Sequence, residues 1–168
     1  MATEIFERLD RDGDEVLSEA DLKASPSVAV VVPLADSNGD GQLDREELSA
    51  RFEQYLTSNL GLAQVRLKFT CNGRPLPRVK VTLTPGVALE HTLTAATAIT
   101  NDEGVCYPKI SGSDIPCVLV GQYTVSVLSD EIDLPAKYNQ STQLGLEVFP
   151  DSERAEDSCT YEFSLSTR

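Results

Sequence analysis

The sequence predicts an α+β protein of two domains, a small all-α domain at residues 1–59 and an antiparallel seven-stranded β-sandwich at residues 60–168. Two observations support this prediction. Apolar residues recur with helical spacing in the first third of the chain and alternate one by one in the remainder. Twelve-residue runs rich in alternating acidic residues occur twice, and both lie in the first third. At 168 residues, the chain can hold one good domain or two small ones.

The second acidic run, DSNGDGQLDREE at residues 36–47, matches the pattern of a calcium-binding loop position by position. Its candidate ligands are Asp36, Asn38, Asp40, Gln42 (through its backbone carbonyl), Asp44 and Glu47. Ca²⁺ is a hard cation that takes six to eight oxygens, and a bidentate carboxylate at position 12 closes the set. Gly41 at position 6 can adopt the positive φ of the sharp turn. The alternative interpretation is a solvated acidic Asx-turn.

The first acidic run, DRDGDEVLSEAD at residues 10–21, follows the same pattern with two departures. Its candidate ligands are Asp10, Asp12, Asp14, Val16 (through its carbonyl), Ser18 and Asp21. Glu15 stands where glycine is expected, so a residue with a Cβ must adopt positive φ at a cost of about 1 kcal/mol. Asp21 is one methylene shorter than the usual glutamate, which favours Mg²⁺ competition. We therefore expect weaker calcium binding here than at residues 36–47.

Apolar residues eight, five, four and one positions before each run form one face of a helix. They are Ala2, Ile5, Phe6 and Leu9 before the first run, and Val28, Val31, Val32 and Ala35 before the second. With these flanks, residues 1 to about 59 resemble a paired EF-hand module. The fourteen residues between the loops must hold two helices of about two turns each, broken at Pro26 and Ser27. Such short helices, and a single methionine, favour a structural or buffering calcium site over a calmodulin-like sensor.

From about residue 64 the apolar pattern has period 2, typical of half-buried strands. The predicted strands are 64–71, 78–84, 95–100, 104–109, 121–128, 143–149 and 159–166. The predicted inward faces are Val65, Leu67 and Phe69, then Val79, Val81 and Leu83, then Tyr123, Val125 and Val127. Short strands with one apolar face each are stabilised by closing two sheets on one another, which predicts the sandwich.

Three motifs of this half carry a second resemblance. They place Gly73, Pro75, Leu76, Val79, Val81 and Leu83 in the first motif, Thr100, Asp102 and Gly104 in the second, and Gly121, Tyr123 and Val125 in the third. This series resembles the carboxypeptidase regulatory-like domains, which are prealbumin (transthyretin)-like sandwiches, over roughly residues 64–128. Arg78 departs from the family's usual glycine. The resemblance implies a non-catalytic accessory or adhesion module of an exported protein, in the extracellular space or the periplasm.

Charge and hydropathy exclude several kinds of partner. The net charge is −13, and the first 59 residues hold 14 acidic against 5 basic side chains. Nucleic acid and anionic membranes repel such a protein. No apolar stretch approaches the roughly twenty residues of a membrane span, and no signal peptide opens the sequence. Because the sequence begins directly on a predicted helix, we expect it to be a piece of a longer exported chain.

The residues offer little support for catalysis, so we predict that the chain is not an enzyme. His91 is the only histidine, which excludes zinc sites with two or three histidines, and no serine lies in a nucleophile elbow. A surface histidine is the simpler interpretation. The loop LPAKYN at 134–139 has two open interpretations: Lys137 and Tyr138 contact a partner, or Leu134, Pro135 and Tyr138 pack the loop onto the sandwich.

The four cysteines also leave alternatives open. Cys71 and Cys159 fall on the first and last predicted strands, and Cys106 and Cys117 bracket a short loop. One or both pairs form disulfides in an oxidising compartment, or all four are small buried apolar residues of a reduced protein.

Three functional hypotheses follow. The first is a calcium-stabilised extracellular module whose sandwich loops contact a protein or glycan; here, calcium removal loosens the N-terminal half and leaves the sandwich folded. The second is an accessory domain of a larger secreted enzyme. The third is a calcium sensor, which would expose an apolar surface only with calcium bound.

Overall fold

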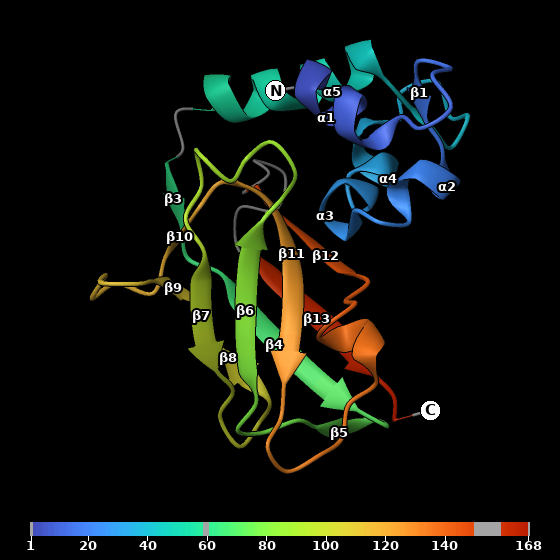
Figure 1. Cartoon of the computed structure of the whole chain (residues 1–168). Helices are drawn as coiled ribbons and strands as arrows, with labels where there is room; N and C mark the ends of the chain where they lie inside the picture. The colour runs from blue at the N-terminus through green and yellow to red at the C-terminus, as the bar shows by residue number, and fades with distance from the viewer. Residues whose placement is uncertain (1, 59–60, 150–158, 168) are drawn as a thin grey trace.

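The computed structural model describes residues 2–58, 61–149 and 159–167, and over these ranges the protein is α+β with strands predominating. Figure 1 shows the α-helices gathered at one end and the longer strands extending away from them, with the short 3-10 helix η1 (Ala136–Tyr138) beside the strands. We call residues 2–58 the helical segment, and residues 61–149 with 159–167 the sheet segment. The predicted domain boundary at 59/60 lies outside the described residues.

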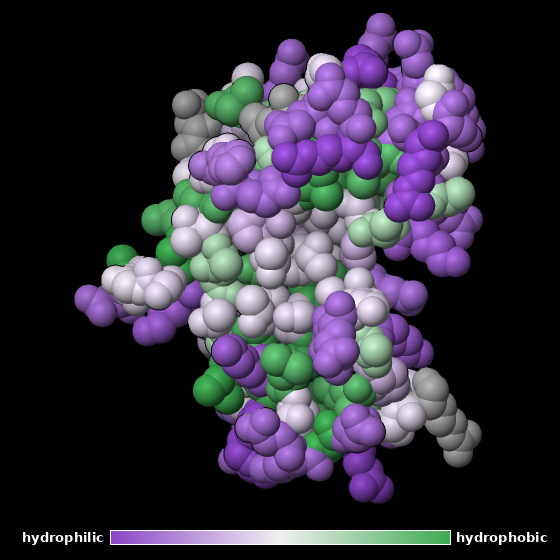
Figure 2. Space-filling view, viewed as in Figure 1, coloured by the Kyte–Doolittle hydropathy of each residue, from purple (hydrophilic) through white to green (hydrophobic). Residues whose placement is uncertain are grey.

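The helical segment contains five helices and one two-stranded ribbon. They are α1 (Ala2–Leu9), α2 (Glu19–Leu22), α3 (Pro26–Ala29), α4 (Val32–Ala35), α5 (Arg45–Thr57), β1 (Val16–Leu17) and β2 (Leu43–Asp44). The apolar face predicted for the first helix is confirmed, because Ile5, Phe6 and Leu9 are buried together with Leu48 and Phe52 of α5. Figure 2 shows hydrophilic side chains over the outer surface of this segment, as its acidic composition leads one to expect.

The prediction of two helices of about two turns each between the acidic runs is wrong. The helix after the first run, α2, has four residues, and the chain before the second run does not form one two-turn helix. Two four-residue helices, α3 and α4, stand there, separated at Val30 and Val31. Pro33 explains the break. It has no N–H to donate to the carbonyl of Ala29, and its ring disfavours the α conformation of the preceding residue.

The sheet segment has one five-stranded sheet in the order β12-β11-β6-β7-β9, with every pair antiparallel. Its strands are β6 (Lys80–Pro85), β7 (Ala96–Ile99), β9 (Lys109–Ile110), β11 (Gly121–Leu128) and β12 (Leu144–Val148). The second sheet runs β13-β4-β5, and β8 also pairs with β4. Its strands are β4 (Arg66–Cys71), β5 (Arg74–Pro75), β8 (Val105–Cys106) and β13 (Thr160–Leu165). A small ribbon joins β3 (Leu62–Ala63) to β10 (Val118–Leu119).

Both sheets bury their apolar faces in one shared core. The three inward faces predicted from alternation are confirmed: all nine side chains have an exposed fraction of 0 %. Phe69 of β4 stacks on Phe163 of β13, with ring centroids 5.0 Å apart. Tyr123 satisfies its buried hydroxyl by donating to the carbonyl of Leu119 at 2.9 Å.

The strand predictions differ from the structure in three respects. The described part of the sheet segment has eleven strands where the sequence predicts seven, because the two-residue strands β3, β5 and β10 lie outside the predicted ranges and one predicted strand divides. The predicted strand 104–109 divides into β8 and β9, which join different sheets. Pro108 lies between them, where it has no N–H to donate to a ladder. The predicted antiparallel arrangement is wrong for β13 and β4, which pair in parallel from Thr160↔Arg66 to Leu165↔Cys71. No hairpin turn joins these strands, so no turn geometry makes them antiparallel.

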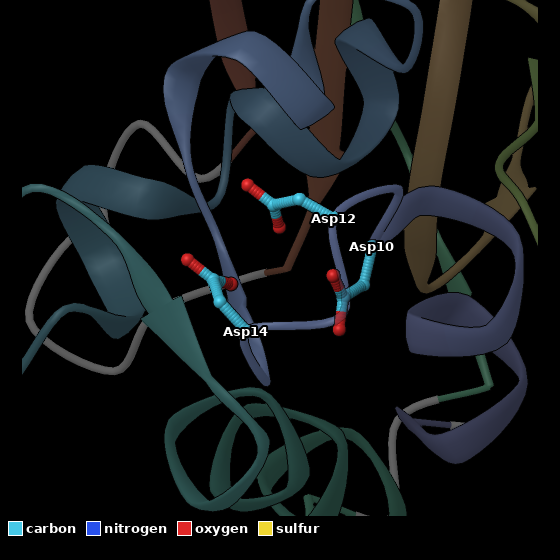
Figure 3. A group of neighbouring side chains, drawn as sticks. All are labelled: Asp10, Asp12 and Asp14. Atoms are coloured by element: carbon cyan, nitrogen blue, oxygen red, sulfur yellow. The ribbon is translucent and has the colours of Figure 1, made fainter.

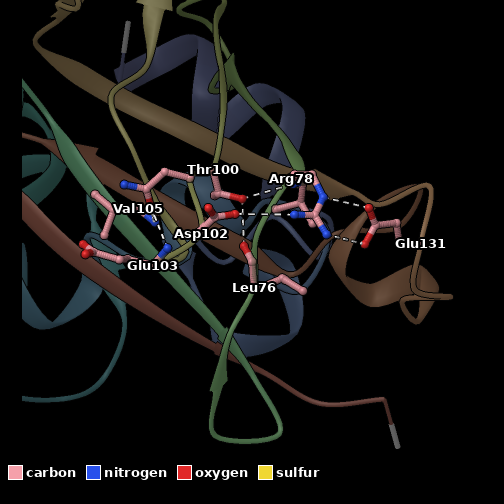
Figure 4. Close-up of polar contacts among 9 residues, drawn as sticks. Leu76, Arg78, Thr100, Asp102, Glu103, Val105 and Glu131 are labelled. Carbon is pink, nitrogen blue, oxygen red and sulfur yellow. Dashed lines mark hydrogen bonds and ion pairs between the residues drawn. The ribbon is translucent and has the colours of Figure 1, made fainter.

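Polar contacts order the loops at the end of the sheets away from the helices (Figure 4). Buried Thr100 donates its hydroxyl hydrogen to the carbonyl of Leu76 at 2.7 Å and accepts from the N–H of Val79 at 3.0 Å. Arg78 has a φ of 55°, which accounts for the glycine expected at this position from the resemblance. Its guanidinium donates to both carboxylate oxygens of Glu131, at 2.8 and 3.0 Å.

The parallel register separates Cys71 from Cys159, although their strands are neighbours. Cys71 lies opposite Leu165, whereas the carbonyl of Cys159 accepts from the N–H of Arg66 at the other end of β4. Each of the four cysteines is a free thiol. Burial raises the pKa of Cys106 to about 12. Cys71, Cys106 and Cys159 are buried, as the interpretation of buried thiols expects, whereas Cys117 is partly exposed. The register of β13 on β4 places Cys71 and Cys159 too far apart to pair with each other.

Candidate metal centre

The two acidic runs, which we call loop one (residues 10–21) and loop two (residues 36–47), lie side by side. They are joined by the β1–β2 ribbon, in which Val16 pairs with Asp44 and Leu17 with Leu43. Leu17 and Leu43 are the eighth residues of their loops, and both have an exposed fraction of 0 %. Because the same position of each loop is paired across the ribbon, a change in the backbone of one loop reaches the other directly.

Loop two folds around its own acidic side chains. Asp36 accepts from the N–H groups of Gly39 at 2.7 Å and Gly41 at 2.8 Å. Asn38 accepts from the N–H of Asp40, and Asp40 from that of Gln42, both at 2.8 Å. Gly41 has a φ of 79°, the conformation expected at position 6. The side-chain oxygens of positions 1, 3 and 5 are thereby held on one turn of the chain.

Glu47 closes loop two from the far side. Its Oε1 accepts from the N–H of Ser37 at 2.8 Å and from the N–H of Asn38 at 3.3 Å, and its Oε2 accepts from the N–H of Asp44 at 3.1 Å. The N–H of Glu47 in turn donates to Oδ1 of Asp44 at 2.8 Å, which forms a capping box at the start of α5. The carboxylate at position 12 therefore already bridges the two ends of the loop.

Loop one repeats this pattern of hydrogen bonds. Asp10 accepts from the N–H groups of Gly13 at 2.8 Å and Glu15 at 3.2 Å, and Asp14 accepts from that of Val16 at 3.1 Å. Glu15 adopts a φ of 67°, so the prediction that it must take the strained conformation is confirmed. The missing glycine leaves the course of the loop unchanged and adds a local energetic cost.

Asp21 reaches across loop one less well than Glu47 reaches across loop two. Its Oδ1 accepts from the N–H of Arg11 at 3.4 Å, compared with 2.8 Å for the equivalent bond from Ser37 to Glu47. Its Oδ2 accepts from the hydroxyl of Ser18 at 2.6 Å. Ser18, a predicted ligand, therefore donates to another predicted ligand. The shorter side chain closes loop one more loosely, as its length leads one to expect.

The carboxylates of Asp10, Asp12 and Asp14 lie close together, with one oxygen of each within 4.8 Å of the others (Figure 3). The negative charge of Asp14 is the main cause that raises the pKa of Asp12 above its usual value, and burial adds to it. A cation placed among these oxygens would remove the repulsion. Repulsion among these three carboxylates therefore favours cation binding at loop one.

The two closing carboxylates behave in the opposite way. Hydrogen bonds from the hydroxyl and N–H of Ser18 lower the pKa of Asp21. Burial acts to raise the pKa of Glu47, but hydrogen bonds donated by the N–H groups of Asp44, Ser37 and Asn38 and by the Ser37 hydroxyl outweigh it and lower the pKa. Both side chains are therefore held in the ionised form, which is the form that ligates a metal.

We expect Asp12→Asn to stabilise the metal-free protein and to weaken metal binding at loop one. A raised folded-state pKa of Asp12 means that its ionised form opposes folding above the folded-state value, and that this penalty is relieved as the pH falls through it. Asparagine removes the charge at every pH. Thermal melting in chelator should therefore show a higher Tm for the variant near pH 7, with the difference shrinking towards acidic pH.

Asp40→Asn in loop two is the matched control, because the neutral Asn38 occupies position 3 there and separates Asp40 from Asp36. A lower Tm for Asp12→Asn in chelator would contradict the role of charge crowding. Both metal-free variants should also lose stability at acidic pH. The pKa values of Glu47 and Asp21 are lowered in the folded protein, so their ionised forms stabilise the fold. This contribution is lost as the pH falls below their ordinary pKa values of 4.5 and 3.8.

The structure brings each set of six predicted ligand positions onto one loop, including Val16 and Gln42, whose carbonyls belong to the backbone at position 7. Sequence reasoning missed Ser37, whose hydroxyl and N–H both donate to Glu47. It also missed Glu147, described below. The second position of the twelve-residue pattern is not one of its candidate ligands, so nothing in the pattern points to Ser37.

Other predicted candidates lie apart from the loops. His91 is exposed in a turn, as its surface interpretation predicts. Leu134 and Tyr138 are 5 % and 8 % exposed, so the loop 134–139 is packed onto the sheets. The Tyr138 hydroxyl accepts from the N–H of Ser166 at 3.1 Å. A structural role of this loop accounts for these contacts.

No protein-family model, curated protein or solved structure matches this chain. Among the helices of the described residues, none has the length and apolar character needed to cross a lipid bilayer.

Proposed function

We propose that the chain is a non-catalytic calcium-binding module of an exported protein, in which an EF-hand pair at residues 1–59 precedes a carboxypeptidase regulatory-like β-sandwich at residues 60–168. The observation that carries the proposal is the repeated hydrogen-bond pattern of loops one and two, joined at their eighth residues by the β1–β2 ribbon. Two acidic turns that arose independently as solvated loops would have no reason to share this pattern.

The ligand chemistry favours calcium at loop two. Its oxygens come from Asp36, Asn38, Asp40, the backbone carbonyl of Gln42 and Glu47, with Asp44 at position 9. This is a set of hard oxygen donors with one carboxylate long enough to bind through both oxygens. The lowered pKa of Glu47 keeps that carboxylate ionised. At loop one the shorter Asp21 favours a smaller ion, so Mg²⁺ competes there.

The sheet segment serves as the binding or structural part of the module. Its resemblance to prealbumin-like domains, and its loops at the end away from the helices, support a protein or glycan as the partner and the extracellular space or periplasm as the location. Contacts such as the ion pair of Arg78 with Glu131 hold these loops in place, as a scaffold that presents binding loops requires.

Isothermal titration of the chelated protein with Ca²⁺ tests this proposal. We expect two binding events, the tighter one at loop two, and a rise in Tm with calcium concentration. Repeating the titration in Mg²⁺ should weaken the second, weaker event more than the first, because magnesium occupies loop one. An absence of heat together with an unchanged Tm would show that the loops are solvated turns and would refute the function.

A further inference from the structure

Three side chains spaced four residues apart lie along one face of helix α5. The first of them, Glu47, closes loop two. Glu47, Arg51 and Tyr55 are separated by one helical turn each, so they lie on the same side of α5. Leu48 and Phe52 lie on the adjoining face and pack into the core of the helical segment. The direction of this helix therefore sets where the carboxylate of Glu47 points.

The second and third residues of this face bind one buried carboxylate of the sheet segment, Glu147 of β12. Arg51 donates from Nε to Oε1 at 2.8 Å and from Nη2 to Oε2 at 2.6 Å, while the Tyr55 hydroxyl donates to Oε1. The exposed fractions of the Arg51 and Glu147 side chains are 13 % and 5 %. Burial and the nearby carboxylate raise the pKa of Tyr55 far above its usual range, so Tyr55 remains a donor. A two-pronged arginine contact fixes orientation as well as distance.

The same strand also contacts α3, the second helix before loop two. A Cβ built on Gly145 of β12 would lie 1.9 Å from the carbonyl oxygen of Pro26, which is the first residue of α3. Backbone thus packs directly on backbone at this point. Ser27 of α3 is 1 % exposed and lies against Gly86 of the sheet segment. Strand β12 therefore contacts the chain on both sides of loop two.

We propose that β12 sets the calcium affinity of loop two, with Glu147 acting as a positioning residue that holds α5 in the direction from which Glu47 reaches the metal. The proposal rests on the proposed function. Coupling between two sites is reciprocal, so calcium at loop two must also stabilise the contact between α5 and β12. If this contact merely stabilised the fold, its removal would lower the Tm without changing the affinity of the folded protein.

The test compares Glu147→Gln and Tyr55→Phe with the wild-type chain in calorimetric titrations with Ca²⁺. We expect the tighter event to weaken about tenfold in Glu147→Gln and about threefold in Tyr55→Phe, with the weaker event less affected. Glu162→Gln is the matched control, because Glu162 forms an exposed ion pair with Lys68 at 3.1 Å on the opposite sheet. That variant should bind calcium as the wild type does.

Tyr55→Phe removes one hydroxyl and keeps the ring, so it keeps the proposal testable if Glu147→Gln does not fold. Hydrogen exchange of the wild-type chain gives a second readout: calcium should slow exchange of the amides at residues 144–148. The proposal is overturned if every folded variant binds within twofold of the wild type, or if calcium leaves exchange at 144–148 unchanged. Failure of the calcium function itself would be distinct, because the wild type would then release no heat.

Discussion

Replacing Glu47 with glutamine is expected to weaken the tighter calcium event by about 100-fold or more, because calcium affinity depends on the charge and number of the ligand oxygens. Among the residues that the structure describes, Glu47 supplies the carboxylate that closes loop two from its far side. Glutamine has nearly the same shape and one carbonyl oxygen, so it can still accept from the N–H of Ser37, as Oε1 of Glu47 does. It loses the charge and the second metal-binding oxygen.

Glu46→Gln is the matched control for this variant. Glu46 precedes Glu47 in the first turn of α5, carries the same side chain and is exposed. Its replacement changes the net charge of the protein by the same amount and should leave the tighter event within about twofold of the wild type, since exposed charges are screened by salt. Equal losses in both variants would indicate that calcium responds only to the general negative charge of the helical segment.

Gly104→Ala is expected to destabilise the protein by about 4 kcal/mol, because it combines overpacking with a strained backbone. Gly104 has a φ of 73°, and a Cβ at this position would lie 2.3 Å from the carbonyl oxygen of Phe69 and 2.9 Å from the nitrogen of Leu76. Both contacts are with backbone, so no side chain can rotate away. The strands on either side would have to separate.

Gly112→Ala separates the two causes. Gly112 has a φ of 81°, and a Cβ there would meet nothing within 4 Å. The variant therefore carries the strain of positive φ alone, at about 1 kcal/mol. Denaturant unfolding of both variants in saturating calcium measures the difference. A loss of only about 1 kcal/mol for Gly104→Ala would mean that the turn at residues 101–104 relaxes at little cost.

Local rules of sequence predicted most of the candidate site and the inward faces of the strands. The alternation of Val81 and Leu83 with polar residues gives their buried positions directly, because side chains of a strand point to opposite faces in turn. The strain at Glu15 also follows from sequence, since position 6 of the loop requires positive φ whatever residue occupies it. These features depend on residues a few positions apart.

The features that sequence did not predict depend on partners far along the chain. Glu147 lies 96 residues from Arg51. Nothing in the sequence around Glu147 distinguishes it from an acidic residue on the exposed face of a strand. The parallel pairing of β13 with β4 likewise depends on a connection with no turn signal. Pro33 is a different case: its effect is local, and it breaks the helix that the apolar spacing of residues 28–35 predicts.

The pairing of β13 with β4 makes completion of the fold a late event during synthesis. Lys68 and Glu162, which face one another across these strands, are 94 residues apart. At ribosomal rates, β13 therefore follows β4 by about 5–20 s. During this interval the apolar face of β4, with Phe69 at its centre, lacks the neighbour that covers Phe69 in the finished protein. The helical segment emerges first, so its acidic surface is already present to keep the nascent chain dispersed while the second sheet remains incomplete.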